Sequence, residues 1–412
     1  MKVLILSDLF PPAFGPRMGY LCKYIKQNGW EPTVITEYIP DKTFSFLLED
    51  DIPVIYVDFF KNKRKSTWIK VLLQDMFFRH KDKKVYNEAL KLVAHQSFDL
   101  VLCSTFRTFP LLAAQKIAHK IKRPLIVDLR DIIEQFAGTE FIAKPLPNLL
   151  GVEKWIASVF RKINLRQRNQ VLKKADHLIT ISPWHVETLK PYNPNISLIY
   201  NGYDPDIFYP KPVESDIFYI TYTGRLTSLA MRNPDLLFRA VKQLMDEKLI
   251  DPETFCIRWF MDEPSQKTIN LEAKKYNIEG FMKFFEYVPA TEIPGILNES
   301  SILLILTNKA DSSGPKGIMT TKFFEALAIE KPILCVRGDE GCLEEVINDT
   351  KTGLSAHNEK EVYDFVKKYY LEWKATKRIV LDADKERITK FSRKEQANQF
   401  IRIFEQVLHI NE

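Results

Sequence analysis

Residues 302–336 read ILLILTNKADSSGPKGIMTTKFFEALAIEKPILCV. This stretch opens on an apolar run at 302–306, passes through a glycine-containing loop into a helical stretch at 321–330, and ends on a second apolar run at 332–336. Runs that are apolar throughout and flank a helix are typical of parallel strands buried on both faces. The stretch therefore predicts a β–α–β unit of a parallel sheet.

The same alternation extends outward over the whole chain. Helical stretches such as 17–29, 86–96, 110–121, 234–248, 265–276 and 292–298 separate further strand-like runs, and the tail at 384–408 predicts one more helix. The remaining runs are 2–7, 32–36, 53–57, 99–103, 124–128, 177–181, 197–200, 218–222, 256–260, 282–286 and 353–355. The pattern occurs twice, so we expect two Rossmann-like, doubly wound domains.

Length supports two domains, because a single core rarely grows beyond about 250–300 residues and this chain has 412. The turn dipeptide Asn201-Gly202, with prolines close behind it, marks the boundary. We expect an N-terminal domain over 1–203, a C-terminal domain over 204–385 and a final helical segment at 386–412.

The cysteines and the lengths of the apolar runs indicate the compartment in which the protein works. The five cysteines form no CxxC pair, and those in apolar runs read as buried small hydrophobes, so we expect a reducing compartment. The N-terminus turns polar too soon for a signal peptide, and no run of about 18 apolar residues is present. These features predict a cytoplasmic protein.

Two stretches, 61–84 and 153–174, interleave lysines and arginines with aromatic and aliphatic residues. A basic amphipathic helix can lie on an anionic membrane surface, at the inner face of the membrane. The alternative is a helix that packs on the core and exposes a solvated basic face. Nucleic acid is disfavoured, because no binding motif accompanies the charge.

Loops that follow predicted strands are the places to look for chemistry, because doubly wound sheets bind ligands at the carboxyl ends of their strands. The loop 8–19 carries Gly15, which could bring backbone amides close to an anion or form a plain turn. At 126–131 the strand IVDLRD ends on charged residues, which suit a site or an internal ion pair of Arg130.

The predicted C-terminal domain opens on a strand that runs into Gly224 and Arg225, and Arg232 follows before the next helix. Arginine makes charge-assisted, bidentate bonds to phosphate oxygens and keeps its charge. Two arginines beside a glycine loop therefore suit a diphosphate.

The loop at 314–319 leads into a helix that begins near Thr320, Thr321 and Lys322. Amides and hydroxyls at a helix N-terminus favour phosphate. Glu325, one turn further on, could accept hydrogen bonds from the hydroxyls of a ribose. Its alternative is a salt-bridged structural carboxylate.

These motifs together resemble the retaining glycosyltransferases of the GT-B fold, in particular the group 1 or family 4 class. The resemblance covers almost the whole chain, and it rests on the order and spacing of several segments. They are the proline–glycine loop ending at Gly15, PLIVDLRD at 124–131, ADHLITIS at 175–182, IYNGYD at 199–204, YTGRL at 222–226, YVP at 287–289, TKFFEALAIEKPIL at 321–334 and FSRKEQA at 391–397.

The resemblance implies that the N-terminal domain (1–203) binds the acceptor and that the C-terminal domain (204–385) binds the nucleotide-sugar. It also implies that the helix of 386–412 crosses back to the N-terminal domain.

The resemblance further implies roles for individual residues. Arg225 and Arg232 would act on the donor diphosphate as catalytic groups, Val288 would contact the base, and Glu325 would bind ribose. Backbone groups of the loop and of the helix start would lie near the phosphates. Asp131 would orient the acceptor or the sugar, and Arg17 and Arg130 would contact the acceptor. The remaining positions on the donor side are Gly15, Gly224, Gly317, Met319, Thr320, Thr321 and Lys322.

Position 317 departs from the family pattern. The family's Glu-x7-Glu motif places its first glutamate there, whereas this chain has Gly317. Branches with a lysine near the second glutamate look closer, and Lys322 fits them. The identity of the donor sugar is therefore open.

The expected activity is transfer of a hexose-type sugar from a UDP- or GDP-sugar to a glycan or lipid-linked acceptor, with retention, in surface polysaccharide or glycoconjugate biosynthesis. No cofactor and no metal are expected, since no DxD motif ends a strand. The rival functions are a nucleotide-sugar 2-epimerase and a non-catalytic subunit that binds nucleotide-sugar. A dinucleotide-dependent dehydrogenase is disfavoured, because the chain lacks a GxGxxG loop.

Overall fold

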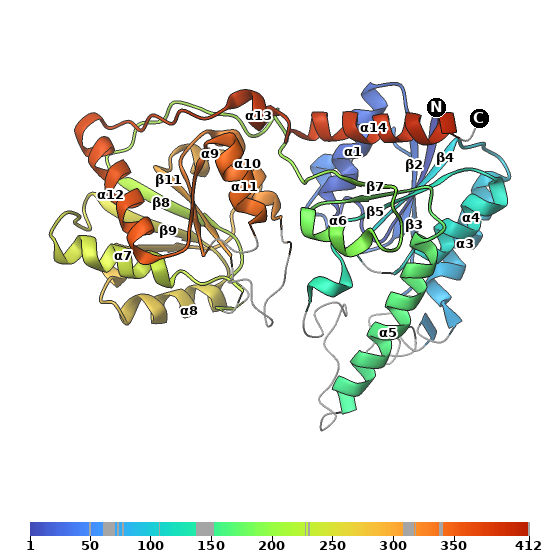
Figure 1. Ribbon diagram of the computed structural model, residues 1–412, viewed down its shortest axis with the longest axis horizontal. Coiled ribbons are helices and arrows are strands. Elements are labelled where there is room, and N and C mark those ends of the chain that lie inside the picture. The colour runs from blue at the N-terminus through green and yellow to red at the C-terminus, as the bar shows by residue number, and fades with distance from the viewer. Residues whose placement is uncertain are drawn as a thin grey trace. The chain divides into compact units, whose positions relative to one another are not determined.

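The computed structural model describes residues 1–48, 51–60, 71, 74–75, 78–106, 108–136, 152–226, 228–229, 231–307, 317, 319–337 and 341–410. The chain divides into two compact units (Figure 1). Unit 1 comprises 1–200 and 393–412, and unit 2 comprises 201–392. The sequence analysis drew its boundaries a few residues away, after 203 and 385.

Unit 1 contains a seven-stranded parallel sheet in the order β3-β2-β1-β4-β5-β6-β7. Its strands are β1 (Lys2–Ser7), β2 (Glu31–Glu37), β3 (Val54–Val57), β4 (Leu100–Thr105), β5 (Leu125–Leu129), β6 (His177–Thr180) and β7 (Ile196–Leu198). The helices are α1 (Pro16–Gln27), α3 (His80–Val93), α4 (Leu111–Ile121), α5 (Val152–Leu172), α6 (Pro183–Leu189) and α14 (Arg393–Ile410), with the 3-10 turns η1 (Ser45–Leu47) and η2 (Ile133–Gln135).

Alternate residues of the unit 1 strands supply two cores, as the period of two along a strand requires. On one face, Val3 and Ile5 of β1 pack with α1 and with Phe400 and Phe404 of α14. On the other face, Leu4 and other strand residues pack with α3, α4 and the end of α5. Figure 1 shows α14 lying along α1, although the two helices are far apart in the sequence.

Unit 2 contains a six-stranded parallel sheet in the order β10-β9-β8-β11-β12-β13. Its strands are β8 (Phe218–Thr223), β9 (Phe255–Phe260), β10 (Met282–Phe285), β11 (Ile302–Leu306), β12 (Ile333–Val336) and β13 (Gly353–Ala356). Its helices are α7 (Asp235–Asp246), α8 (Glu263–Lys274), α9 (Ile293–Asn298), α10 (Thr321–Ile329), α11 (Cys342–Thr350), α12 (Glu359–Thr376) and α13 (Lys385–Thr389), with the 3-10 turn η3 (Glu279–Phe281).

Each predicted strand overlaps one strand of the structure, and both sheets are parallel, so the predicted fold class is confirmed. Both sheets also reverse their strand order at one point, between β1 and β4 in unit 1 and between β8 and β11 in unit 2. Such switch points are where doubly wound domains bind ligands.

The tail differs from its prediction as one helix over 384–408. Two helices, α13 and α14, are separated by a short turn at 390–392, in which Ser392 forms a β-bridge with Tyr203. The Tyr203 amide donates to the carbonyl of Phe391 at 3.1 Å, and a Cβ on Gly202 would lie 2.3 Å from that carbonyl oxygen. This close pairing of backbones interrupts the helix.

The five cysteines are all buried and free, as the sequence predicts. Among the described residues, none of the helices is both long and apolar enough to span a membrane.

Candidate functional site

Three positive side chains of unit 2 gather where β8 ends. The Lys322 ammonium lies against Gly224, at 1.9 Å from the position that a Cβ on this glycine would take. The Arg232 guanidinium donates to the carbonyl of Arg225, which also accepts from the Tyr222 hydroxyl at 3.0 Å. Residues from the β8 loop and from the first turn of α10 are thus brought together at the switch point of the sheet.

Gly224 is required here for two physical reasons. Its φ of +140° lies in a region that side chains rarely adopt, and any Cβ would collide with the Lys322 ammonium. The glycine therefore lets a cation approach the backbone of the loop.

The surroundings of Lys322 disfavour its positively charged form. Burial lowers the pKa of Lys322 from 10.5 to about 8, the nearby Arg232 lowers it further, and the Glu325 carboxylate acts in the opposite direction. Glu325 lies one turn along α10 from Lys322. Two cations and one carboxylate thus share a partly buried position.

Arg225 is the most exposed of the three cations. Its side chain is 70% accessible, and its Nε lies 3.2 Å from a carboxylate oxygen of Asp262. Asp262 also caps α8 by accepting from the amide of Ser265. Close by, Asp262 and Arg225 both influence the pKa of Tyr287, which burial raises, and Val288 follows in the segment after β10.

The segment before α10 places backbone groups of Met319 and Thr320 at the start of this helix. Thr320 is the N-cap residue of α10, and its side chain makes no capping hydrogen bond. The carbonyl of Met319 accepts from the side chain of Asn201 at 3.2 Å. Gly317 is buried and has φ +64°, a left-handed conformation that disfavours glutamate at this position. Residues 308–316 and 318 lie outside the described residues.

The unit 1 loop 8–15 ends in Gly15, the N-cap of α1, which has φ +117°. A Cβ there would lie 2.5 Å from the carbonyl oxygen of Leu9. Gly15 therefore folds the loop tightly on itself.

Arg17 and Arg130 both lie in buried ion pairs of unit 1. Arg17 donates to Asp128 at 2.9 Å and to the carbonyls of Ile199 and Tyr200. Arg130 pairs with Asp8, so the second of its two predicted roles, an internal ion pair, is found in the structure. These contacts give Arg17 a structural role, so we do not propose it as an acceptor contact.

Asp131 lies at the end of a polar chain that the sequence analysis missed. Gln135 donates to Asp131 at 2.9 Å, and its side-chain oxygen lies 2.9 Å from Nε2 of His185. The other ring nitrogen, Nδ1, lies 3.1 Å from the Thr180 hydroxyl. Burial lowers the pKa of His185 to about 3, so the ring is neutral and carries a proton on only one of its two nitrogens.

This chain of bonds positions Asp131, whose pKa is raised by burial. The sequence held a signal for the involvement of His185. This histidine lies in the SPWHV segment directly after the strand 177–181, at a carboxyl strand end where ligands bind. Asp8 and Asp262 were likewise missed as partners of candidate arginines. Among the described residues, no group of three or more His, Cys, Asp or Glu side chains is placed to hold a metal ion.

Two family models match the chain. Residues 17–207 match Glycosyltransferase Family 4, and residues 206–380 match Glycosyl transferases group 1. Together they span both parallel sheets apart from the first strand. The chain therefore belongs to the glycosyltransferases, with a family 4 domain followed by a group 1 domain.

Solved structures identify the fold as GT-B. HepE from Anabaena, in complex with UDP, has a TM-score of 0.65 at 17% identity, covering 98% of this chain and 100% of that chain. Sucrose-phosphate synthase from Thermosynechococcus elongatus has a TM-score of 0.63 at 12% identity, covering 100% of each chain.

A UDP-GlcNAc 2-epimerase from Methanocaldococcus jannaschii has a TM-score of 0.53 at 12% identity, covering 98% of this chain and 100% of that chain. No curated protein matches the chain by sequence. Similarity at these identities defines the architecture and leaves the reaction to be argued from the site.

Proposed function

We propose that unit 2 binds a nucleoside diphosphate sugar, carrying UDP or GDP, and that the protein transfers the sugar to an acceptor. The observation that carries this proposal is the approach of Arg232 and Lys322 to the backbone of the Gly224 loop at the switch point, with the exposed Arg225 in the same loop. Arg232 and Lys322 repel each other in a partly buried place, and a bound diphosphate would offset that repulsion.

The neighbouring groups suit the rest of the donor. Glu325 would accept hydrogen bonds from ribose hydroxyls, and the backbone near Val288 would contact the base. Backbone groups of Gly317, Met319, Thr320 and Thr321 would lie near the phosphates. The complex of UDP with the structurally similar HepE supports UDP as the first nucleotide to test.

The proposed reaction retains the configuration of a hexose-type sugar. The bond between the anomeric carbon and the phosphate oxygen breaks, and the acceptor oxygen bonds to the anomeric carbon on the same face. The acceptor proton passes to the departing phosphate. Arg225 and Arg232 would stabilise the charge that develops on the diphosphate, without a metal ion. This stabilisation of the transition state would make the largest contribution to the rate enhancement. Retention rests on the resemblance to the retaining class.

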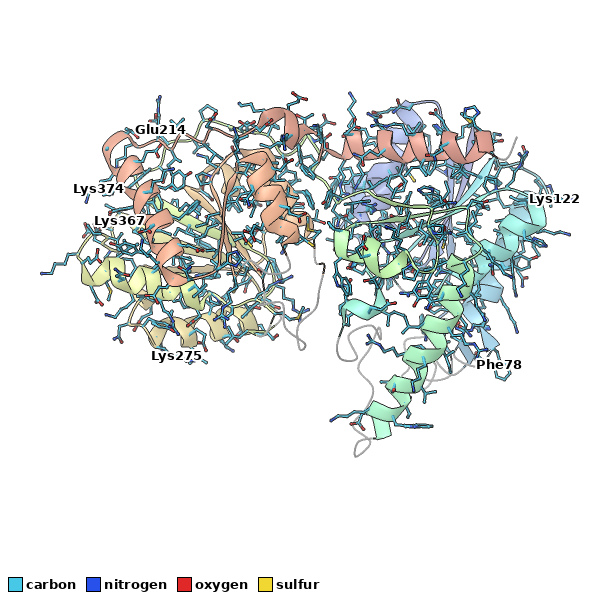
Figure 2. The ribbon with its side chains drawn as sticks, viewed as in Figure 1. Phe78, Lys122, Glu214, Lys275, Lys367 and Lys374 are labelled. Carbon is cyan, nitrogen blue, oxygen red and sulfur yellow. The ribbon has the colours of Figure 1, made fainter. Side chains whose placement is uncertain are left out.

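The acceptor is proposed to be a glycan or a lipid-linked glycan of a surface polysaccharide, reached at the cytoplasmic face of the membrane. Supporting this, α5 has an exposed stripe that carries Lys154, Lys162 and Arg166 at multiples of four residues, and Trp155 beside it is 68% exposed. In the other basic stretch, Phe78 is 66% exposed and lies at the surface of unit 1 (Figure 2). Lys63, Arg64 and Lys65 lie outside the described residues.

The test is the release of nucleotide from UDP-glucose, UDP-galactose, UDP-GlcNAc and GDP-mannose, followed by ³¹P NMR with and without a membrane extract. We expect one donor to release its nucleoside diphosphate faster with the extract, and the Arg232→Ala variant to lose that release. Binding without any turnover would favour the non-catalytic subunit. Release of an epimerised sugar without acceptor would instead define an epimerase.

A further inference from the structure

A fully buried histidine of unit 1 lies at the inner end of a chain of hydrogen bonds that leads to the end of β5. The ring of His185, on α6, lies with Nδ1 at 3.1 Å from the Thr180 hydroxyl and with Nε2 at 2.9 Å from Oε1 of Gln135. Burial and the nearby charge of Arg168, itself paired with Glu134, lower the pKa of the ring to about 3. The neutral ring carries one proton, so the direction of both bonds depends on which nitrogen holds it.

The orientation of the Gln135 amide follows from its other contacts. The backbone amide of Ile132 can only donate, and it faces Oε1 of Gln135 at 3.2 Å. The amide nitrogen of Gln135 therefore faces Asp131 and donates to its Oδ1 at 2.9 Å. With Oε1 turned toward His185, these two side chains are hydrogen-bonded only if Nε2 of the ring carries the proton.

The Thr180 hydroxyl could complete the chain in two ways. It has one proton and lies within reach of Nδ1 of His185 and, at 3.0 Å, of the carbonyl of Leu129. If it donates to Leu129, then Nδ1 must donate to it, and the bare Nε2 meets the acceptor Oε1 of Gln135. If it donates to Nδ1, the ring and the Gln135 amide are both satisfied, and every bond points toward Asp131. Buried polar groups favour the satisfied arrangement.

Asp131 is a half-buried carboxylate at the carboxyl edge of the unit 1 sheet, two residues after β5 ends. Burial raises its pKa, the donor Gln135 and the charge of Arg130 oppose this rise, and the charge of Asp8 adds to it. Its Oδ2 receives no hydrogen bond from the residues that the structure describes, and 137–151 lie outside them. Within the described residues, Gln135 thus fixes one oxygen of Asp131 and leaves the other for a ligand hydroxyl.

We propose that His185 and Gln135 are positioning residues for sugar transfer, which hold Asp131 ionised and with one oxygen directed at a hydroxyl group of the substrate. Neither residue touches the substrate in this role, which rests on the proposed function. A carboxylate that is already oriented accepts such a bond without the entropic cost of ordering its side chain. A purely structural role would stabilise the fold and leave the protonation of Asp131 unchanged, so experiment can separate the two roles.

The direction of the hydrogen bonds can be measured on the full chain without any substrate. Two-bond ¹H–¹⁵N correlation NMR distinguishes the two neutral tautomers of a histidine ring, and comparison with His185→Gln assigns the signals among the seven histidines. We expect His185 to carry its proton on Nε2 and to stay neutral from pH 5.5 to 8.5. A proton on Nδ1, or titration of the ring within this range, overturns the proposal.

The pH profile of nucleotide release tests the positioning role itself. His185→Phe removes both ring bonds, so the Gln135 amide is no longer held with its nitrogen toward Asp131. We expect kcat to fall about three- to tenfold, as for the loss of one neutral hydrogen bond. The acidic limb of the profile should move to higher pH, because Asp131 ionises less readily without its donor. His185→Gln can still donate to Gln135 and should restore part of the activity and of the limb position.

The matched control is Asn193→Ala in the same unit, which removes buried bonds to the carbonyls of Leu172 and Ala175. It should lower stability in urea unfolding and leave the acidic limb in place. If His185→Phe shows the same behaviour, His185 is only structural and the proposal is wrong. Where His185→Phe does not fold, Gln135→Met takes its place, and the same shift of the limb is required. Absence of turnover in the wild type refutes the proposed function and the positioning role with it, whereas turnover with an unmoved limb refutes the positioning role alone.

Discussion

At the scale of single residues, the proposed donor site contains a lysine ammonium in the space that a side chain on Gly224 would fill. Lys322 occupies the space above Gly224, and Gly317 adopts a left-handed conformation at the position where the family has a glutamate. The residue types were visible in the sequence, and their roles followed from the resemblance. Contact between Lys322 and Gly224 was not predictable, because it joins loops nearly a hundred positions apart.

The lowered pKa of Lys322 predicts a pH-dependent donor affinity. In the free protein, Lys322 loses its proton above about pH 8, whereas a bound diphosphate favours the ammonium form. Affinity should therefore be full below pH 8 and fall as the pH rises, by up to about tenfold per unit. Calorimetric titration with UDP and GDP at pH 7.0 to 9.5 measures this.

The control for this prediction is Lys322→Arg, which keeps its charge over the whole range. We expect its affinity to stay nearly constant between pH 7.0 and 9.5. The same decline in both proteins would show that Lys322 is not the titrating group.

A methyl group on Gly224 should disturb the same contact. In Gly224→Ala, the added Cβ must displace the Lys322 ammonium, and φ +140° becomes strained. Nucleotide affinity should fall about ten- to hundredfold, in line with a charge-assisted contact of about 1.5–3 kcal/mol. Gly280→Ala is the matched control, because a Cβ there meets nothing within 4 Å. Unchanged affinity in Gly224→Ala would argue against Lys322 as a donor contact.

At the scale of elements, strands were predicted better than helices. Every predicted strand was found, because runs buried on both faces are apolar throughout and cannot be mistaken for loops. The sequence analysis named no helix between β12 and the tail, where α11 and α12 lie. A signal was present, since α12 buries Val362, Val366, Tyr369, Tyr370 and Trp373, three or four residues apart.

Other features of elements came only from the structure. The break between α13 and α14 depends on a β-bridge to Tyr203, which is distant in the sequence. The residues around the break therefore do not predict it. The polar chain from His185 to Asp131 likewise joins segments about fifty residues apart. Tertiary contacts of this kind override local propensity.

The packing of α3 on α4 predicts how stability depends on pH. Asp82 of α3 is 5% exposed and accepts from the amide of Ala113 at 3.0 Å. Burial raises the pKa of Asp82 to about 7, well above the value of an unfolded chain. The native state therefore binds the extra proton, and the free energy of unfolding should fall as the pH rises from about 4 to 7.

The variant Asp82→Asn keeps a carbonyl oxygen and removes the charge. We expect it to be more stable than the wild type at pH 8 by about 1–3 kcal/mol, and nearly equal to it at pH 4. Urea unfolding at both pH values measures the difference. A variant less stable than the wild type at pH 8 would mean that the ionised carboxylate stabilises the helix pair.

At the scale of the whole molecule, the exposed face of α5 predicts a response to membranes. Replacing Lys154, Lys162 and Arg166 by glutamine should weaken binding to phosphatidylglycerol vesicles, by about 1 kcal/mol for each charge removed, and more at low salt. Vesicle sedimentation at two salt concentrations measures this. The control removes three lysines of unit 2, namely the exposed Lys275 and Lys374 and the half-buried Lys367 (Figure 2). Equal losses in both variants would indicate an unspecific effect of net charge.

Unit 2 is proposed to bind a nucleoside diphosphate through the cations at the end of β8 and through Glu325. Calorimetric titration of the wild type and Glu325→Ala with UDP and GDP measures that binding. We expect one nucleotide to bind at micromolar strength and the variant to lose about 1–3 kcal/mol of binding free energy. If neither nucleotide binds, or if binding is indifferent to Glu325, the assignment of this site to the donor is wrong.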